Sequence, residues 1–334
     1  MKKDVAIVGG GIIGLMTAWQ LAQRTNLSIA LFEREECGAG ATGAAIGGLI
    51  PYSFSRSQGV AEVQRQSIQK YPTIAEELRV LTGIDCGYTR AGRIHVFTSD
   101  GQRDNAHKDV ECSDGWQKML PAFHKFDGEP EVVIGEFGGL QCDLTAFVKI
   151  TLLIEALKKA CQLAGVEVCE QTPITDLVEI CAQAEQVVVA TGCWTQALIP
   201  DCEVRPVKGQ ALKLKLPKQI FTRMVRQNEV YLVPYADGTV LVGSTSEPEA
   251  GFDITPTAEA RNVLFGKACQ MVPALAQAEV VDHWAGLRPR GGKRQPLIKR
   301  IDGQTLMAAG HHKIGLCLAP SVADAVVQDI SSIF

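Results

Sequence analysis

The sequence predicts an α/β fold, in which a parallel sheet forms around an N-terminal β-α-β unit and a second, antiparallel sheet belongs to a separate α+β domain. The apolar run Asp4 to Val8 ends at a glycine turn, as a buried parallel strand does. Residues 15–22 then carry apolar side chains at helical spacing, and a second apolar run extends from Ser28 to Phe32. Strand and helix patterns interleave along the rest of the chain, which favours α/β architecture.

The turn after the first strand reads Gly9-Gly10-Gly11-Ile12-Ile13-Gly14 and fits the G-x-G-x-x-G pattern of dinucleotide-binding units. Gly9 permits the tight turn, Gly11 lets a pyrophosphate approach the backbone, and Gly14 lets the helix pack against the strand. The helix N-terminus offers unpaired N–H groups and a partial positive charge to the phosphates.

Glu33 ends the second strand, 19 residues after Gly14 and close to the interval of about 20 expected for the ribose-binding acid. Its carboxylate can accept hydrogen bonds from ribose hydroxyls and would repel a 2′-phosphate. Strand, turn, helix, strand and acid together predict a Rossmann-type unit. The unit by itself leaves FAD and NAD as alternatives.

The segment Glu33–Gly48 is a loop of small residues, where an NAD-dependent dehydrogenase would continue with a regular helix. It resembles the loop beside the FAD pyrophosphate in the glycine oxidase and D-amino-acid oxidase family of flavoproteins. Two more segments resemble this family: the strand Glu185–Cys193, which contains Ala-Thr-Gly, and the segment Ala308–Pro320, a strand followed by Gly-His and a helix. The resemblance extends from residue 4 to about residue 330 and implies FAD as the cofactor.

By this resemblance, the cofactor-binding residues come from the beginning, middle and end of the chain. They are Gly9, Gly11, Ile12, Ile13, Gly14, Glu33, Arg34, Ala41, Thr42, Ile46, Gly47, Gly48, Ile174, Thr191, Gly192, Gly310, His311, His312, Lys313, Ile314, Gly315 and Leu316. Ile174 would offer backbone groups to the adenine, and N–H groups of the last helix would stabilise negative charge on the reduced ring. Non-covalent binding is expected, because no cysteine falls in Trp284–Gln295, where the related sarcosine oxidase carries one.

Four segments resemble glycine oxidase more closely than other relatives: Arg205–Gln210, Val230–Pro234, Val240–Ser244 and Trp284–Pro289. The resemblance assigns the substrate carboxylate to Arg288, whose planar guanidinium matches a carboxylate with two parallel hydrogen bonds. From the residues alone, a structural arginine paired with a core acid is the alternative.

Tyr231 would add a hydroxyl to the same carboxylate, although a buried tyrosine on an alternating strand is also common as a core residue. The chain departs from the family at two of its predicted site residues. Lys313 stands where glycine oxidases carry arginine, and Gly48 replaces a bulkier apolar residue, which would enlarge the pocket.

The resemblance implies hydride transfer from the Cα of a small amine or amino acid to flavin N5, with hydrolysis of the imine and oxygen as the acceptor. The alternative is a flavin dehydrogenase of the same superfamily that oxidises a D-amino acid, an N-methyl amino acid or a 2-hydroxy acid with another acceptor. An amine that binds neutral needs no protein base, so we nominate no catalytic acid or base. A flavin-carrying binding protein without turnover and an NAD enzyme are further alternatives.

The three flavin motifs predict a discontinuous FAD-binding domain of residues 1–78, 143–202 and 283–334, with a substrate-binding domain of residues 79–142 and 203–282. Within the first, Leu144 to Ala164 is expected to form a helix and Val166 to Val168 a strand.

Composition sets limits on the partners of the chain. Of the 334 residues 21% are charged, with a net charge of −4, which argues against nucleic-acid binding. No uninterrupted apolar run reaches the roughly 18 residues of a transmembrane span, and Asp4 interrupts any signal-like segment. The eleven cysteines are scattered without metal-site spacing, so no metal is predicted and a cytoplasmic location is expected. The sequence leaves open whether the chain forms a homo-oligomer.

Overall fold

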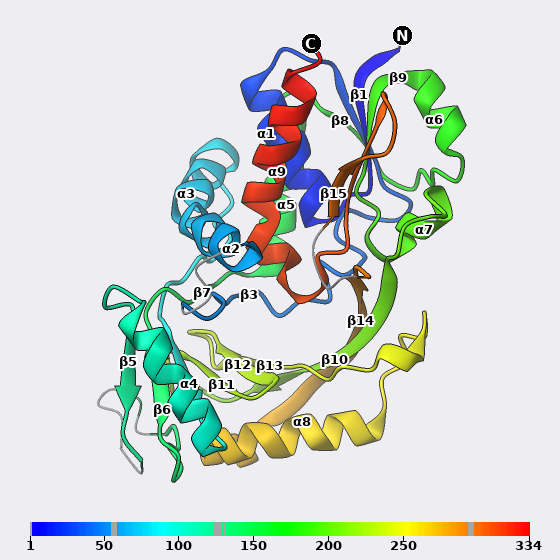
Figure 1. Cartoon of the computed structure of the whole chain (residues 1–334). Coiled ribbons are helices and arrows are strands. Elements are labelled where there is room, and N and C mark those ends of the chain that lie inside the picture. The colour runs from blue at the N-terminus through cyan, green and yellow to red at the C-terminus, as the bar shows by residue number, and fades with distance from the viewer. Residues whose placement is uncertain (1, 55–58, 123–128, 130, 293–296) are drawn as a thin grey trace.

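The computed structural model describes residues 2–54, 59–122, 129, 131–292 and 297–334, and its strands form two large sheets (Figure 1). The first sheet has the strand order β15-β16-β9-β1-β2-β8, in which all neighbours are parallel except β15 and β16. Its strands are β1 (Lys3–Val8), β2 (Ile29–Phe32), β8 (Glu167–Cys169), β9 (Ala184–Val189), β15 (Leu297–Arg300) and β16 (Thr305–Ala309). The predicted parallel sheet around the N-terminal β-α-β unit is confirmed.

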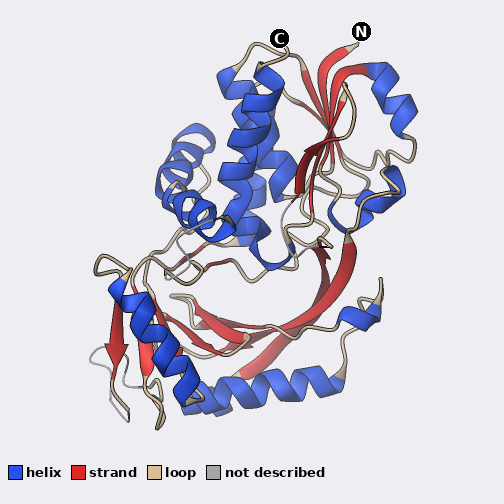
Figure 2. Ribbon diagram, viewed as in Figure 1, coloured by secondary structure: helices blue, strands red, loops and turns tan. Residues whose placement is uncertain are grey.

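Helices cover both faces of the first sheet (Figure 2), because alternate residues of its central strand point to opposite sides. Val5 and Ile7 pack into a cluster with residues of the helices α1, α5 and α9, whereas Ala6 and Val8 pack into a cluster with residues of α6 and α7. The five helices are α1 (Ile12–Arg24), α5 (Ile150–Leu163), α6 (Leu177–Gln183), α7 (Thr195–Leu198) and α9 (Gly315–Ser331). Two more helices, α2 (Val60–Gln69) and α3 (Tyr71–Thr82), pack beside α9 and α5.

The second sheet has eight strands in the order β14-β10-β13-β12-β11-β4-β6-β5, all antiparallel except the pair β11 and β4. Its strands are β4 (Arg93–Val96), β5 (Gln117–Leu120), β6 (Gly139–Cys142), β10 (Arg205–Lys215), β11 (Met224–Gln227), β12 (Val230–Pro234), β13 (Thr239–Gly243) and β14 (Glu279–Arg290). Helix α8 (Ala258–Met271) packs on one face, where Leu264 and Ala268 join Leu212 and Val242 in one core cluster. Helix α4 (Asp100–Glu111) lies beside β5. The opposite face of the sheet is turned toward the first sheet (Figure 1).

The helix predicted over Leu144–Ala164 begins later than expected, at Ile150. Ala146–Phe147 instead form the short strand β7, which pairs with β3 (Gly48–Leu49). The backbone N–H of Val148 donates to the Gly47 carbonyl at 3.0 Å, and these tertiary hydrogen bonds outweigh the helical pattern of the apolar residues. The predicted strand at 166–168 forms one residue later, as β8.

Helix α9 and the turn before it, His312–Ser331, are long and apolar enough to cross a membrane by length and composition, the one such helix in the described residues. The sequence reading missed this match because Asp324 and Asp329 interrupt the apolar run. More than half of the segment is buried inside the molecule, where it packs against α1 and α2, as a core helix does.

The domain boundaries proposed from the sequence stay a prediction. The second sheet takes its strands from residues 93–142 and 205–290, so β14 belongs to this sheet along its whole length. The first sheet takes its strands from the remaining parts of the chain, at the beginning, middle and end.

Candidate active site

A cavity of about 1110 Å³ lies between the two sheets. The strand ends and loops of the first sheet form one wall, and residues of β10, β12 and β14 form the other. Every predicted site residue except Gly14 and Gly47 lines this cavity. The fold therefore brings together segments that are far apart in the sequence, as the discontinuous flavin motifs predicted.

The glycine turn is as tightly packed as its spacing predicted. Gly9 has φ +111°, and a Cβ there would lie 2.5 Å from the Ala190 carbonyl oxygen of the neighbouring strand. A Cβ on Gly14 would lie only 1.9 Å from the Gly9 carbonyl oxygen, so Gly14 serves helix packing and not the cavity wall. Gly11 does line the cavity, and its nearest neighbour would be the Thr42 hydroxyl at 3.3 Å.

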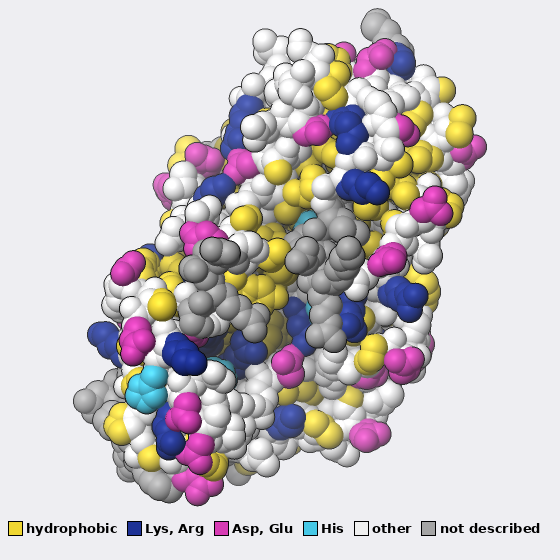
Figure 3. Space-filling model, in the orientation of Figure 1, with side chains coloured by type: hydrophobic (Ala, Val, Ile, Leu, Met, Phe, Trp, Pro, Cys, Tyr) yellow, Lys and Arg dark blue, Asp and Glu magenta, His cyan; other side chains and the backbone are white. Residues whose placement is uncertain are grey.

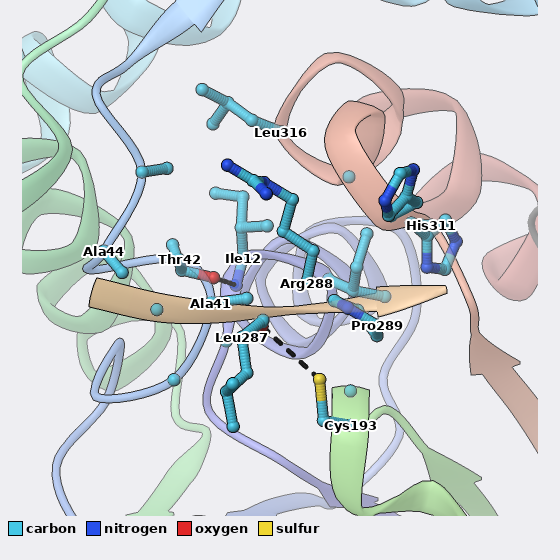
Figure 4. Close-up of a pocket in the computed structure, with 18 of the residues that line it drawn as sticks. Ile12, Ala41, Thr42, Ala44, Cys193, Leu287, Arg288, Pro289, His311 and Leu316 are labelled. Atoms are coloured by element: carbon cyan, nitrogen blue, oxygen red, sulfur yellow. Dashed lines mark hydrogen bonds between the residues drawn. The ribbon is translucent and has the colours of Figure 1, made fainter. Parts of the chain in front are cut away.

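The loop of small residues closes over the N-terminus of α1. The Ile12 N–H donates to Thr42 Oγ1 at 3.0 Å, as the dashed line in Figure 4 shows, and Ala41 borders the same part of the cavity. Gly47 lies behind the wall and has φ +81°. A Cβ there would clash with the Val148 carbonyl oxygen, at a distance of 2.1 Å. The backbone of this loop thus depends on small residues at several positions, which the resemblance had indicated.

Glu33 sits at the end of β2 on the cavity wall, but its carboxylate also holds the turn together. It accepts the Gly10 N–H at 2.7 Å and the Glu35 N–H at 3.1 Å. A carboxylate has lone pairs left after two such bonds, so ribose recognition stays compatible with this arrangement. Arg34 stacks its guanidinium 3.6 Å above the centre of the Trp194 ring, an aromatic cavity residue that we did not predict.

The strand β9 approaches the glycine turn from the other side. Thr191 and Gly192 follow it and line the cavity, and Gly192 has φ +57°. The Cys193 thiol donates to the Leu287 carbonyl at 3.4 Å, which joins this turn to β14 (Figure 4). Ile174 lies on the same wall as predicted.

The turn between β16 and α9 supplies the residues from Gly310 to Leu316. Burial lowers the pKa of both His311 and His312 to about 4, and the charge of Lys313 contributes for His312. Both imidazoles are therefore neutral at pH 7. Lys313 forms an ion pair with Glu229, which lines the cavity from the loop between β11 and β12.

Arg288 extends from β14 into the cavity on the side of Leu316 (Figure 4). One terminal nitrogen, Nη1, donates to the Thr245 carbonyl at 3.1 Å, and Nη2 donates to the Ser244 hydroxyl. The guanidinium lies flat over Gly209, where a Cβ would come within 2.0 Å of Nη2. Its position is thus fixed by hydrogen bonds to neutral groups, and no carboxylate in the described residues forms an ion pair with it.

Tyr231 lies on β12 and lines the same part of the cavity. Burial raises the pKa of Tyr231 to about 12, while the charges of Arg288 and Arg226 act in the opposite direction. Its hydroxyl is therefore protonated at neutral pH and can donate to an anion. A Cβ on Gly48 would lie 3.0 Å from the Tyr231 ring and 3.2 Å from the Met224 methyl carbon. The expectation that Gly48 enlarges the pocket is wrong, because the side chains of Tyr231 and Met224 fill the space beside it.

A family model described as FAD dependent oxidoreductase, DAO, matches residues 4–328. The chain belongs to the DAO family of FAD-dependent oxidoreductases. Among the curated relatives of this DAO-family oxidoreductase, the glycine oxidase of Pseudomonas putida is 32% identical and covers 96% of the chain and 92% of its own length. The crystal structure of glycine oxidase from Geobacillus kaustophilus superposes with a TM-score of 0.92 at 30% identity, over 99% of the chain and 95% of its own. The predicted family and FAD cofactor are confirmed.

The fold of the DAO family also occurs in proteins of other activity. A solved L-proline dehydrogenase from P. horikoshii superposes with a TM-score of 0.88 at 21% identity, over 99% of this chain and 94% of its own. At that identity the likeness shows a shared fold alone.

The cavity fits FAD at the glycine turn of this DAO-family oxidoreductase. Gly11 and the first residues of α1 form its wall, and a Cβ on Gly11 would meet only the Thr42 hydroxyl within 4 Å, which leaves the backbone open to a phosphate. Backbone N–H groups at a helix N-terminus are suited to bind a pyrophosphate. The two neutral histidines and the start of α9 also border the cavity, and N–H groups at the start of a helix favour negative charge.

Sequence reasoning missed several residues of this site. Gly209 and Ser244 lie within segments recognised as family-like, and the pairing of β10 with β14 and β13 brings both next to Arg288. Arg226 and Arg290 also line the cavity. Strand register, which no single-sequence pattern supplies, was the missing signal.

Proposed function

We propose that the protein oxidises a small amine or amino acid at its Cα, as a glycine oxidase-like enzyme with oxygen as the acceptor. Its membership of the DAO family and the two glycine oxidases at 30–32% identity support the reaction class. The observation that carries the proposal is Arg288, a partly buried guanidinium without an acidic partner in the described residues, placed in the cavity beside Tyr231.

The residues of the site act in this proposal by binding and orientation. Arg288 binds the substrate carboxylate through two parallel hydrogen bonds, and Tyr231 donates its hydroxyl to the same group. FAD supplies the acceptor for the hydride that leaves the Cα. The side chains of Tyr231, Met224 and Ile50 limit the space beside Gly48, so a small substrate is favoured over one with a bulky side chain.

No protein base is assigned to the reaction. His311 and His312 line the cavity and are neutral, but they belong to the predicted flavin-binding turn. An amine that binds uncharged needs no base for hydride loss. The imine product then reacts with water to give a keto or aldehyde acid and ammonia.

The acceptor separates the two candidate activities. The glycine oxidase relatives favour oxygen, whereas a dehydrogenase of the superfamily would pass electrons to another acceptor. We expect one hydrogen peroxide per substrate oxidised in air, measured with a coupled peroxidase. Substrate-dependent bleaching of the flavin without peroxide formation would instead favour the dehydrogenase.

Non-covalent FAD and a cytoplasmic location also stand as proposals. No cysteine occurs in Trp284–Gln295, of which residues 293–295 lie outside the described part of the chain, and this supports non-covalent binding. All eleven cysteines are free thiols, which supports a reducing compartment. Acid precipitation is expected to leave the yellow flavin in the supernatant. Flavin that stays in the pellet would contradict non-covalent binding.

The reaction itself is tested by an anaerobic substrate panel. Glycine and small D-amino acids should bleach the flavin absorbance, and Arg288→Ala should lower kcat/KM by about 10- to 100-fold, the loss expected for a charge-assisted pair of ~1.5–3 kcal/mol. Arg288→Lys keeps the charge without the planar fork, so its kcat/KM should fall between those of the wild type and Arg288→Ala. Unchanged kcat/KM in Arg288→Ala would overturn the proposed clamp.

A further inference from the structure

The cavity contains more positive charge around Tyr231 than one substrate carboxylate requires. Among the described residues, four cationic side chains line this end of the cavity, Arg226, Arg288, Arg290 and Lys313, together with one acid, Glu229. The charge of Lys313 is balanced by its ion pair with Glu229. In the proposed function Arg288 binds the carboxylate of the substrate. Arg226 and Arg290 are left without an acidic partner in the described residues.

Of these two guanidinium groups, Arg226 is the one beside the proposed substrate site. In the antiparallel ladder Arg226 pairs directly with Tyr231, and Tyr231 pairs directly with Gly243. Direct partners point to the same face of a sheet, so Arg226 and Tyr231 both point into the cavity. Arg290 lies instead at the end of β14 that bridges to His311, among the predicted cofactor residues.

Arg226 is also held in place for an incoming anion. Its Nε donates to the Asn228 carbonyl at 2.7 Å, the one hydrogen bond that the described residues make with this guanidinium. The terminal nitrogens stay available, and they present the planar fork that matches a carboxylate. The field of Arg226 reaches the Tyr231 hydroxyl, where it lowers the pKa together with Arg288.

Within the part of the chain that the structure describes, Arg226 forms no ion pair, and its charge acts on the nearby Glu229. The neighbour of Arg226 on the parallel strand β4 is His95, and burial lowers the pKa of His95 to about 3, so this imidazole is neutral. The face shown in Figure 3 has Lys and Arg side chains beside the central hollow, on the side of the second sheet. Since like charges repel, an anion bound here would relieve an unfavourable arrangement.

We propose that Arg226 is a specificity residue that binds a second carboxylate of the substrate, so that the preferred substrate is a small amino acid with two acidic groups. This inference rests on the proposed oxidase function. It extends that function by assigning one carboxylate to Arg288 and Tyr231 and the other to Arg226.

The test uses pairs of substrates that have the same shape and differ by one charge. The holoenzyme is assayed with D-aspartate against D-asparagine, and with N-(carboxymethyl)glycine against its monoamide. For at least one pair we expect kcat/KM to favour the acid by about tenfold or more, the discrimination of a charge-assisted hydrogen bond. Arg226→Gln should reduce this acid-to-amide ratio to about 1, and added salt should reduce it in the wild type.

The ratio within a pair isolates the second carboxylate, because general damage to the site affects both members equally. Arg261→Gln removes the same charge from the exposed side of α8, on the other face of the sheet, and should keep the wild-type ratio. Glu229→Gln removes a carboxylate whose charge interacts with Arg226, and it should raise the ratio.

The outcomes separate this inference from the proposed function. Oxidation of the neutral amides without preference for the acids, or an acid preference that survives in Arg226→Gln, overturns the role of Arg226 and leaves the oxidase intact. Weaker FAD binding in Arg226→Gln with an unchanged ratio would also overturn it. If no amine in the panel bleaches the flavin, both proposals fail.

Discussion

At the scale of single residues, the position of the Arg288 guanidinium depends on a neighbour that has no side chain. Gly209 pairs with Gly286 on the adjacent strand, two residues from Arg288, and leaves space for the guanidinium to lie flat against β10. Hydrogen bonds from Arg288 to Ser244 and Thr245 then fix the plane of the group. A site that recognises carboxylate by a planar fork needs such support, because small rotations of the plane break one of two hydrogen bonds.

Gly209→Ala is therefore expected to damage substrate binding without removing any charge. A Cβ at 2.0 Å from Nη2 must displace the guanidinium, so KM for a carboxylate substrate should rise by about tenfold or more, as for a lost charge-assisted hydrogen bond. Steady-state kinetics measure the loss of substrate binding, and the flavin content shows separately whether the cofactor site is intact. Gly266→Ala is the control, since Gly266 lies on α8 with open space around it, and unchanged KM in Gly209→Ala would contradict the prediction.

The buried His311, in the turn between β16 and α9, makes stability depend on pH. The folded pKa of His311 is about 4, below the ordinary value of about 6.5, so its contribution is present above pH 6.5 and is lost as pH falls toward 4. Between pH 7 and pH 5 we expect a loss of about 2 kcal/mol in unfolding free energy from this group.

Denaturant unfolding of His311→Gln should show a weaker dependence on pH over the same range. His107→Gln, on the exposed surface of α4, should retain the wild-type dependence. Equal pH dependence in wild type and His311→Gln would show that His311 is not the titrating group.

At the scale of elements, the β1-turn-α1 unit was predictable because its constraints are local. Gly9, Gly11 and Gly14 lie within six consecutive residues, and each meets a requirement of backbone geometry that the spacing alone expresses. The helix predicted at 144–164 was wrong at its start for the opposite reason. Its first residues form hydrogen bonds to Gly47 and Cys86, which lie far away in the sequence.

Gly14→Ala tests the packing of this unit. The added Cβ would lie 1.9 Å from the Gly9 carbonyl oxygen, so strand and helix must separate, which should cost about 1–3 kcal/mol or more. We expect a lower melting temperature and a lower FAD content after purification. Gly101→Ala, in the open first turn of α4, is the matched control, and a variant with wild-type FAD content would contradict the prediction.

At the scale of the whole molecule, the cavity between the two sheets couples cofactor binding to the stability of both. The walls come from the end of β1 and the turn after β9 on one side and from β10, β12 and β14 on the other. A ligand that binds only the folded state stabilises it in proportion to the logarithm of its concentration. We therefore expect FAD that binds in this cavity to stabilise the arrangement of the two sheets.

Titration of apoprotein with FAD should raise the free energy of unfolding by about 2.7 kcal/mol at a concentration 100 times Kd. Flavin fluorescence and tryptophan fluorescence should report one common transition in the holoprotein. A melting temperature independent of FAD concentration would contradict this linkage. Two separate transitions in the holoprotein would show that the sheets unfold independently.

The sequence alone determined the β1-turn-α1 unit, the parallel sheet and the predicted residues between Gly9 and Leu316 that line the cavity, with Gly14 and Gly47 behind the wall. These features depend on local backbone geometry or on segments long enough to resemble a family. Only the tertiary structure decided that Gly209 and Ser244 support Arg288, that Tyr231 occupies the space beside Gly48, and that Arg226 stands next to Tyr231. The physical reason is that these contacts are set by the register between strands, which depends on how distant segments pack and not on any local pattern.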